Sequence, residues 1–171
     1  MKVLGSLLII GATSLFGCRM AIDMEQRYAQ MKELRQIMYL LQSEIAYSRA
    51  FLAEAFLRIS RQTSEPYSVW LRQMYYRMQK RTGGTFEQVW YETIQEYLIS
   101  ARLPSQEKKR LEELGKCLGS PDAGMQVKSI DLYEEQLALS MHEVKEGLRT
   151  KKRLCHCLGV MSGIFLAILL I

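Results

Sequence analysis

The residues best suited to chemistry in this chain are its two histidines, its four cysteines and two helical glutamates. Cys155-His156-Cys157 resembles a metal-binding motif, but residues two apart on a helix point in different directions, and no second ligand pair exists in the sequence. Glu44 and Glu54 lie about 80° out of register on one helix, so they do not share a face for acid–base chemistry. These residues predict neither a metal site nor paired catalytic carboxylates.

The sequence also lacks the patterns of a phosphate-binding loop and of a nucleic-acid-binding surface. Gly83-Gly84 follows basic residues, but the spacing and the strand–loop–helix context of a phosphate-binding loop are missing. The net charge is +5, and the basic residues are interspersed with glutamates, as in Glu107-Lys108-Lys109-Arg110 followed by Glu112-Glu113, which is typical of a solvated helix face. We therefore expect a protein that is not an enzyme, holds no cofactor and binds no nucleic acid.

The elements that carry these residues begin and end in apolar sequence. Residues 3–18 and 154–171 contain no charged side chain, and about 20 such residues span a bilayer. Basic residues follow the first segment from Arg19 onward and precede the second up to Arg153, which predicts that the middle lies on the cytoplasmic side. We expect a transmembrane helix over 1–22, a cytoplasmic helical domain over 23–153 and a second transmembrane helix over 154–171.

The first apolar segment has a second interpretation. Leu15-Phe16-Gly17-Cys18 resembles a lipoprotein cleavage site, although phenylalanine is a poor fit at its position. In that case the chain would be an exported lipoprotein anchored at Cys18.

The middle of the chain predicts helices alone. Three prolines and the pair Gly83-Gly84 divide it into five pieces, which begin near 22, 66, 85, 105 and 120. The first is expected to run unbroken over 22–60, Thr85 and Gln88 form a capping box, and Ser105 is expected to cap the fourth helix. We predict an all-α fold, an antiparallel helical bundle of about five helices with a transmembrane helix at each end. The apolar stripes expected to form the core are Met31, Leu34, Met38, Leu41, Ile45, Leu52, Ala55 and Ile59; Trp70, Met74 and Met78; Val89, Trp90, Ile94, Tyr97 and Leu98; and Ile130, Tyr133, Leu137, Met141, Val144 and Leu148.

Three stretches, taken in order, resemble one known family. They are the run from Leu41 to Tyr47 with Glu54 after it, then Leu118-Gly119 with the residues that follow, and the basic-to-apolar run that begins at Lys152. With the length and the apolar ends, this order resembles stage III sporulation protein AB of endospore-forming Firmicutes. The sequence departs from the family pattern at Ala50-Phe51-Leu52, where Thr-Pro-Leu is frequent.

This resemblance implies a location and partners. The family is expected in the mother-cell membrane around the forespore, within a multi-protein channel complex. Its cytoplasmic domain is similar to the protein F domains of the inner-membrane platforms of type II secretion and type IV pilus machines. The expected partners are the secretion-ATPase-like stage III sporulation protein AA, other membrane proteins of the same complex, and the lipid bilayer.

The motif residues are candidates for partner contact, and each also has a structural interpretation. Asp122 suits a helix cap, Gln126 and Lys128 suit a polar face, and Glu44 with Tyr47 could form a buried polar contact between helices. A membrane-anchored helical sensor or adaptor is the alternative function; a deep apolar pocket would favour it. The candidate residues are Glu44, Tyr47, Glu54, Asp122, Gln126 and Lys128.

Overall fold

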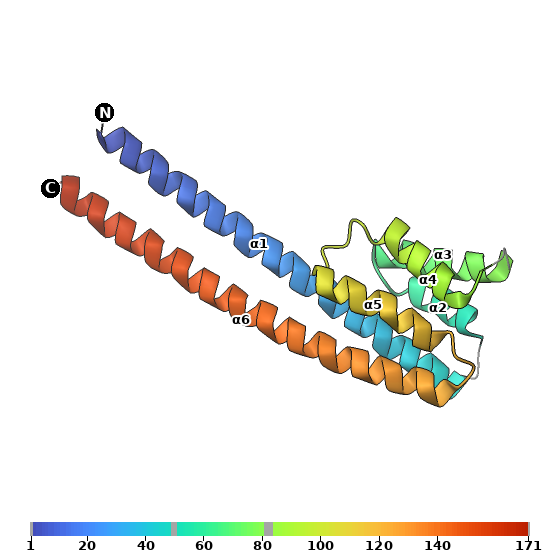
Figure 1. Cartoon of the computed structure of the whole chain (residues 1–171). Helices are drawn as coiled ribbons and strands as arrows, with labels where there is room; N and C mark the ends of the chain where they lie inside the picture. Colours follow the sequence, from blue (N-terminus) through green and yellow to red (C-terminus); the bar gives the residue numbers. More distant parts are fainter. Residues whose placement is uncertain (1, 49–50, 81–83, 171) are drawn as a thin grey trace. The chain divides into compact units, whose positions relative to one another are not determined.

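The computed structural model describes the backbone of residues 2–48, 51–80 and 84–170. Side chains are described for residues 19–47, 51–80, 84–151, 153–154, 157 and 161. Within these ranges the secondary structure is entirely helical, with six α-helices and one π-helical turn (Figure 1). The elements are α1 (Lys2–Ser43), the π-helical turn η1 (Glu44–Ser48), α2 (Leu52–Ser60), α3 (Tyr67–Lys80), α4 (Phe86–Tyr97), α5 (Ser105–Leu118) and α6 (Ala123–Leu170).

The chain forms two compact units, and α1 and α6 each contribute to both. The terminal unit comprises Met1–Tyr28 and Met141–Ile171. Within it α1 and α6 approach closely, because a Cβ added at Gly147 would lie 2.9 Å from Cε of Met24. Among the residues described with side chains, no helix is both long and apolar enough to cross a bilayer. The predicted membrane segments 1–22 and 154–171 lie largely outside those residues and remain predictions.

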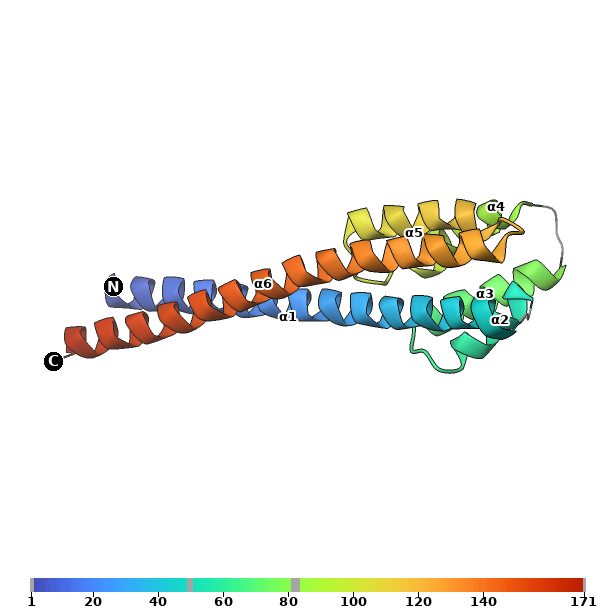
Figure 2. The same ribbon diagram turned by 90° about the horizontal axis from the view of Figure 1, so that it is seen from below.

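The central unit, Ala29–Ser140, contains the rest of the bundle. Its portions of α1 and α6 run antiparallel, side by side, in both ribbon views (Figures 1 and 2). The four shorter helices pack in chain order, α2 on α3, α3 on α4 and α4 on α5. The all-α fold and the bundle are therefore confirmed.

An aromatic cluster forms the centre of this unit. The rings of Trp70 and Trp90 meet edge to face with centroids 4.9 Å apart, and Phe56 and Phe86 lie 6.0 and 5.8 Å from Trp90. Both indole N–H groups are satisfied: Trp70 donates to Oγ1 of Thr93 at 3.2 Å, and Trp90 to the carbonyl of Leu111 at 2.7 Å. Buried aromatic pairs of this geometry each stabilise a fold by about 0.5–1.5 kcal/mol beyond the area they bury. The helical stripes supply most of the remaining core of this unit, where the buried residues are Met31, Leu34, Met38, Leu41, Ala55, Ile59, Met74, Ile94, Leu98, Ile130, Tyr133 and Leu137.

One predicted element is wrong. The helix expected over 22–60 breaks at its middle, where α1 ends at Ser43, a π-helical turn follows, and α2 begins at Leu52. No proline or glycine lies there, so local sequence contains no breaker. The break lets α2 turn back and bury Ala55, Phe56 and Ile59 against its neighbours. The tertiary burial of that apolar face outweighs helix continuity.

The helix caps agree with the sequence at two of three sites. Thr85 and Gln88 form the predicted capping box at the start of α4. Oδ1 of Asp122 accepts the backbone N–H of Gly124 at 2.8 Å and so caps α6, as its sequence position suggested. Ser105, however, does not cap α5: the N-cap is Pro104, whose carbonyl accepts the N–H of Lys108 at 3.0 Å. The extended backbone of Pro104 (φ −55°, ψ 142°) moves the cap one residue earlier than predicted.

Candidate partner-contact surface

The six candidate residues lie at one end of the central unit, in two groups. Glu44 and Tyr47 lie in the π-helical turn η1 and Glu54 in the first turn of α2, and the other three lie at the start of α6. Two polar contacts join the helices here: Nε2 of Gln42 donates to Oδ1 of Asp131, and Nε of Arg35 lies 3.9 Å from Oε2 of Glu134. The antiparallel course of α1 and α6 thus brings both motifs to the same end (Figures 1 and 2).

Glu44 supports the turn from within. Its Oε2 lies 3.4 Å from Nη2 of Arg58 on α2, and its side chain is only 22% exposed. This ion pair joins the π-helical turn to the helix that follows it. Glu54 is exposed in the first turn of α2, where a carboxylate interacts favourably with the helix dipole. Glu44 therefore has a structural contact in this turn, and Glu54 remains exposed to solvent.

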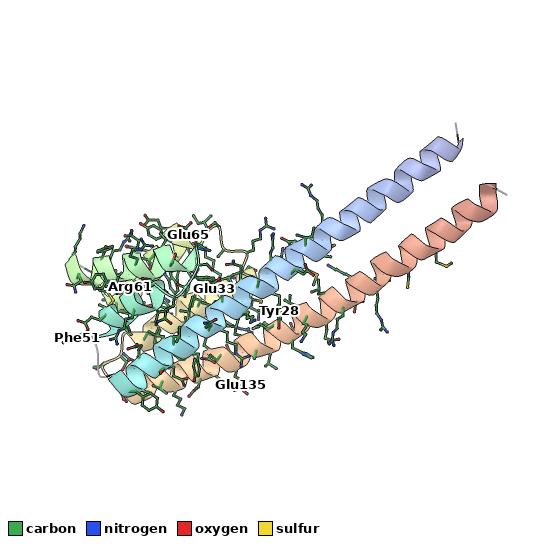
Figure 3. All side chains as sticks on the ribbon, turned by 180° about the vertical axis from the view of Figure 1, so that it is seen from behind. Tyr28, Glu33, Phe51, Arg61, Glu65 and Glu135 are labelled. Carbon is green, nitrogen blue, oxygen red and sulfur yellow. The ribbon has the colours of Figure 1, made fainter. Side chains whose placement is uncertain are left out.

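Tyr47 does not form the buried polar contact with Glu44 that the sequence suggested. It is 86% exposed, because the π-helical turn directs it away from the core. Phe51, the N-cap of α2, is 82% exposed and lies at the same end of the unit (Figure 3). Two aromatic side chains in water are energetically unfavourable, since burying each would gain about 1.5–3 kcal/mol.

The second group separates into structural and exposed residues. Gln126 donates through Nε2 to the carbonyls of Leu118 and Ser120, at 2.8 and 2.6 Å, so it closes the link between α5 and α6. With Asp122 at the cap, both residues are used in building the α5–α6 connection. Lys128 is exposed two residues further along α6. It is the member of this group that is available to a partner.

We name the exposed set Tyr47, Phe51, Met125 and Lys128 the tip surface. Met125 is 54% exposed, and two further apolar residues of α6, Leu132 and Leu139, are 58% and 64% exposed. Residues seven apart on a helix lie on one face, so these three form a stripe. The buried residues Ile130, Tyr133 and Leu137 lie on the opposite side of the same helix. The tip surface therefore continues along α6 as an apolar stripe that the fold itself does not use.

Charges between α1 and α6 are partly desolvated on the face of α6 that meets α1, away from the exposed stripe. Burial raises the pKa of Glu134 above its ordinary value; the Arg35 guanidinium opposes this rise, and Asp131 adds to it. The contact is a weak one, since Arg35 is half exposed and surface pairs contribute about 0–1 kcal/mol. Its small energy means that it adds little to the stability of the α1–α6 pair.

A buried carboxylate between α5 and α6 was missed at the level of sequence. Glu107 is 1% exposed, and its Oε1 accepts from Nη1 of Arg110 at 2.5 Å and from Oγ of Ser140 at 2.7 Å. Burial raises the pKa of the neighbouring Tyr133 well above its ordinary value, and the Glu107 charge raises it further. The sequence spacing could have indicated this burial, since Glu107 lies on the same face of α5 as the buried Leu111, Leu114 and Leu118.

The remaining chemical residues form no site in the part of the chain that is described. Over those residues, no group of three potential metal ligands is found. His142 and Cys157 are exposed, whereas Cys155 and His156 lie outside the residues whose side chains are described. The tip surface itself exposes aromatic, aliphatic and cationic side chains, the types that are common in protein interfaces.

Comparisons with known proteins agree on one family. The family of stage III sporulation protein AB matches residues 2–171. A curated relative, the stage III sporulation protein AB of Bacillus subtilis (strain 168), is 26% identical over 170 residues, which cover 99% of each chain. A solved structure of a stage III sporulation protein AB is similar in fold, with a TM-score of 0.66 at 23% identity over 72% of this chain and 97% of that one. This chain belongs to the stage III sporulation protein AB family.

Proposed function

We propose that this protein is a membrane-anchored platform of the channel complex between mother cell and forespore, and that its tip surface docks the secretion-type ATPase AA. Family membership supports a role in stage III of sporulation. The observation that carries the docking role is the exposure of Tyr47 and Phe51, at 86% and 82%. A partner that buries these side chains would turn their unfavourable hydration into binding energy.

The composition of the tip surface suits such an interface. Aromatic residues and methionine are enriched at the centres of protein interfaces, and aromatic anchors frequently dominate the binding energy. Lys128 adds a positive charge that can steer an acidic partner surface. The stripe of Leu132 and Leu139 extends the available apolar area along α6.

The anchoring role depends on the terminal segments. α1 and α6 continue, without a change of secondary structure, from the central unit into the uncharged sequences at the two ends of the chain. The basic residues that flank those sequences favour a cytoplasmic location for residues 23–153, with 1–22 and 154–171 in the mother-cell membrane. A cytoplasmic motor would then be coupled, through the same two helices, to the membrane.

Co-purification of the full chain with the AA-like ATPase from membranes of sporulating cells tests the docking role. The double variant Tyr47→Ala/Phe51→Ala and the variant Lys128→Glu are expected to reduce recovery of the ATPase strongly. Tyr91→Ala and Lys116→Glu are matched controls, since Tyr91 is 50% exposed on α4 and Lys116 is exposed on α5. Equal recovery with the tip variants and the controls would refute docking at this surface.

Topology is tested separately. Gly84 is exposed next to the N-cap of α4, so Gly84→Cys in a cysteine-free background offers a labelling site on the central unit. We expect protection from an impermeant maleimide in intact cells and labelling after lysis. Labelling of intact cells would place the central unit outside and contradict the proposed anchoring.

The alternative functions receive less support. Two recesses of about 390 and 600 Å³ among the described residues of the central unit are lined mainly by polar and charged side chains, and neither is the deep apolar pocket expected of a ligand sensor. A lipoprotein cleaved before Cys18 would lose the part of α1 that precedes it. The mass of the mature N-terminus distinguishes that form from the intact chain.

A further inference from the structure

A groove of about 600 Å³ lies on the central unit between α1 and the turn that follows α2, and it shares no lining residue with the tip surface. One wall is the face of α1 that carries Lys32, Glu33 and Gln36, and the other is the turn from Arg61 to Ser64. Figure 3 labels Glu33 and Arg61, one on each wall. The lining is polar almost throughout, with Ala29 as its single apolar residue.

The charges in this groove leave two cations available. Glu33 is already engaged, because its Oε1 accepts from the backbone N–H of Ser64 at 2.7 Å and from Oγ of the same residue at 2.5 Å. Lys32 and Arg61 are exposed, and no ion pair joins either of them to another described residue. The nearest unengaged acid in sequence is Glu65, which is exposed beyond the turn.

The rest of the lining offers hydrogen bonds alongside the aliphatic carbons of its long polar side chains. The side-chain amides of Gln36 and Gln62 are exposed in the groove and can both donate and accept. An extended polypeptide presents carbonyl and N–H groups that such amides match. The volume also exceeds what a single small anion would fill.

We propose that this groove binds an acidic polypeptide segment of a protein partner, with carboxylates of that segment paired to Lys32 and Arg61. An anionic membrane surface is the less suitable occupant, because lipid recognition by basic residues generally uses clusters of about 4–8 that lie next to a membrane segment. Here two cations lie on opposite walls of a recess. The groove and the tip surface consist of different residues, so this proposal can be tested separately from ATPase docking.

Binding is tested with the full chain in detergent and a fluorescein-labelled twelve-residue peptide that has glutamate at alternate positions. The control peptide has glutamine in place of each glutamate. The double variant Lys32→Gln/Arg61→Gln is compared with Lys109→Gln/Lys116→Gln, which removes the same charge from exposed positions on α5. Fluorescence anisotropy gives Kd in low salt and in 0.5 M salt.

We expect the glutamate peptide to bind the wild-type chain, with Kd raised about tenfold by the groove variant and less than twofold by the α5 variant. The glutamine peptide and high salt should each abolish most of the binding. Failure of the glutamate peptide to bind, equal binding of both peptides, or equal effects of the two double variants would overturn the proposal. Displacement by short-chain phosphatidylglycerol at concentrations where unlabelled peptide is ineffective would overturn it in favour of a lipid site.

Discussion

Gly115 is the position where the core should be least tolerant of a single added methyl group. It is buried on α5 directly against the indole of Trp90. A Cβ built on Gly115 would lie 2.3 Å from Cδ1 and 2.8 Å from Cγ of that ring, whereas carbon atoms in contact are normally about 3.5–4.0 Å apart. Gly115→Ala therefore requires Trp90 or α5 to move by more than an ångström.

The ring cannot move without cost. Its Nε1 donates to the carbonyl of Leu111 at 2.7 Å on the same helix as Gly115, and its opposite side packs on Trp70 with centroids 4.9 Å apart. Overpacking of this kind typically costs about 1–3 kcal/mol, and disrupting the hydrogen bond costs about 1 kcal/mol more. Alanine recovers about 1 kcal/mol through its greater helix propensity. The net expectation is a loss of about 2 kcal/mol in the free energy of unfolding.

Thermal unfolding of the full chain in detergent measures this loss. For a chain of this length about 2 kcal/mol lowers Tm by about 4–8 °C. Tryptophan fluorescence reports directly on the site, since the chain contains two tryptophans and both belong to this cluster. Gly119→Ala is the control, because its Cβ would lie 3.4 Å from Phe86 in ordinary contact, and its Tm should change by less than about 2 °C. A Gly115→Ala protein as stable as wild type would show that the packing of α5 on Trp90 is looser than described.

Three further predictions concern stability. Thr93→Val keeps the shape of the side chain but leaves Nε1 of Trp70 buried without its acceptor, so urea unfolding should show a loss of about 1–3 kcal/mol in the free energy of unfolding. Thr93→Ser keeps the hydroxyl acceptor and should keep most of the wild-type stability. Thr85→Ala removes the capping box of α4 and should cost about 0.5–2 kcal/mol by the same assay, and an unchanged midpoint would contradict a role for the cap. Burial raises the pKa of Tyr133 above its ordinary value of 10.0. The neutral phenol therefore contributes its full stability below pH 10.0, and this contribution is lost as the pH rises above that value. Tyr133→Phe should shift alkaline unfolding, followed by circular dichroism, to higher pH.

The sequence predicted the fold class and most of the core because both depend on local periodicity. Met31, Leu34, Met38 and Leu41 follow a helical repeat, and all four are fully buried. The cap at Asp122 and the capping box at Thr85 are equally local, since donor and acceptor lie within three residues. Such features need no knowledge of how helices meet.

The candidate surface was predicted less well, because its residues acquire their roles through contacts distant in sequence. Gln126 proved to bind the carbonyls of Leu118 and Ser120, and Glu44 proved to pair with Arg58. Neither partner could be chosen from spacing alone. The exposed members, Tyr47 and Lys128, remain candidates for partner contact. Phe51 could not be added to them from its sequence, because its exposure follows from the break between α1 and α2.

The break between α1 and α2, which local sequence does not predict, also exposes the two aromatic residues of the proposed docking surface. A continuous helix over 22–60 would carry Phe56 and Ile59 past the end of α1, away from Tyr67 and Trp70 of α3. The end of α1 at Ser43 and the new start of α2 at Leu52 let Phe56 and Ile59 be buried, at 0% and 2% exposure, and the core gains about 1.5–3 kcal/mol for each large apolar side chain enclosed. The same turn leaves Tyr47 and Phe51 in water, where they contribute little to the fold. The core uses the turn but not those two aromatic rings, and this is why we propose that a partner buries them.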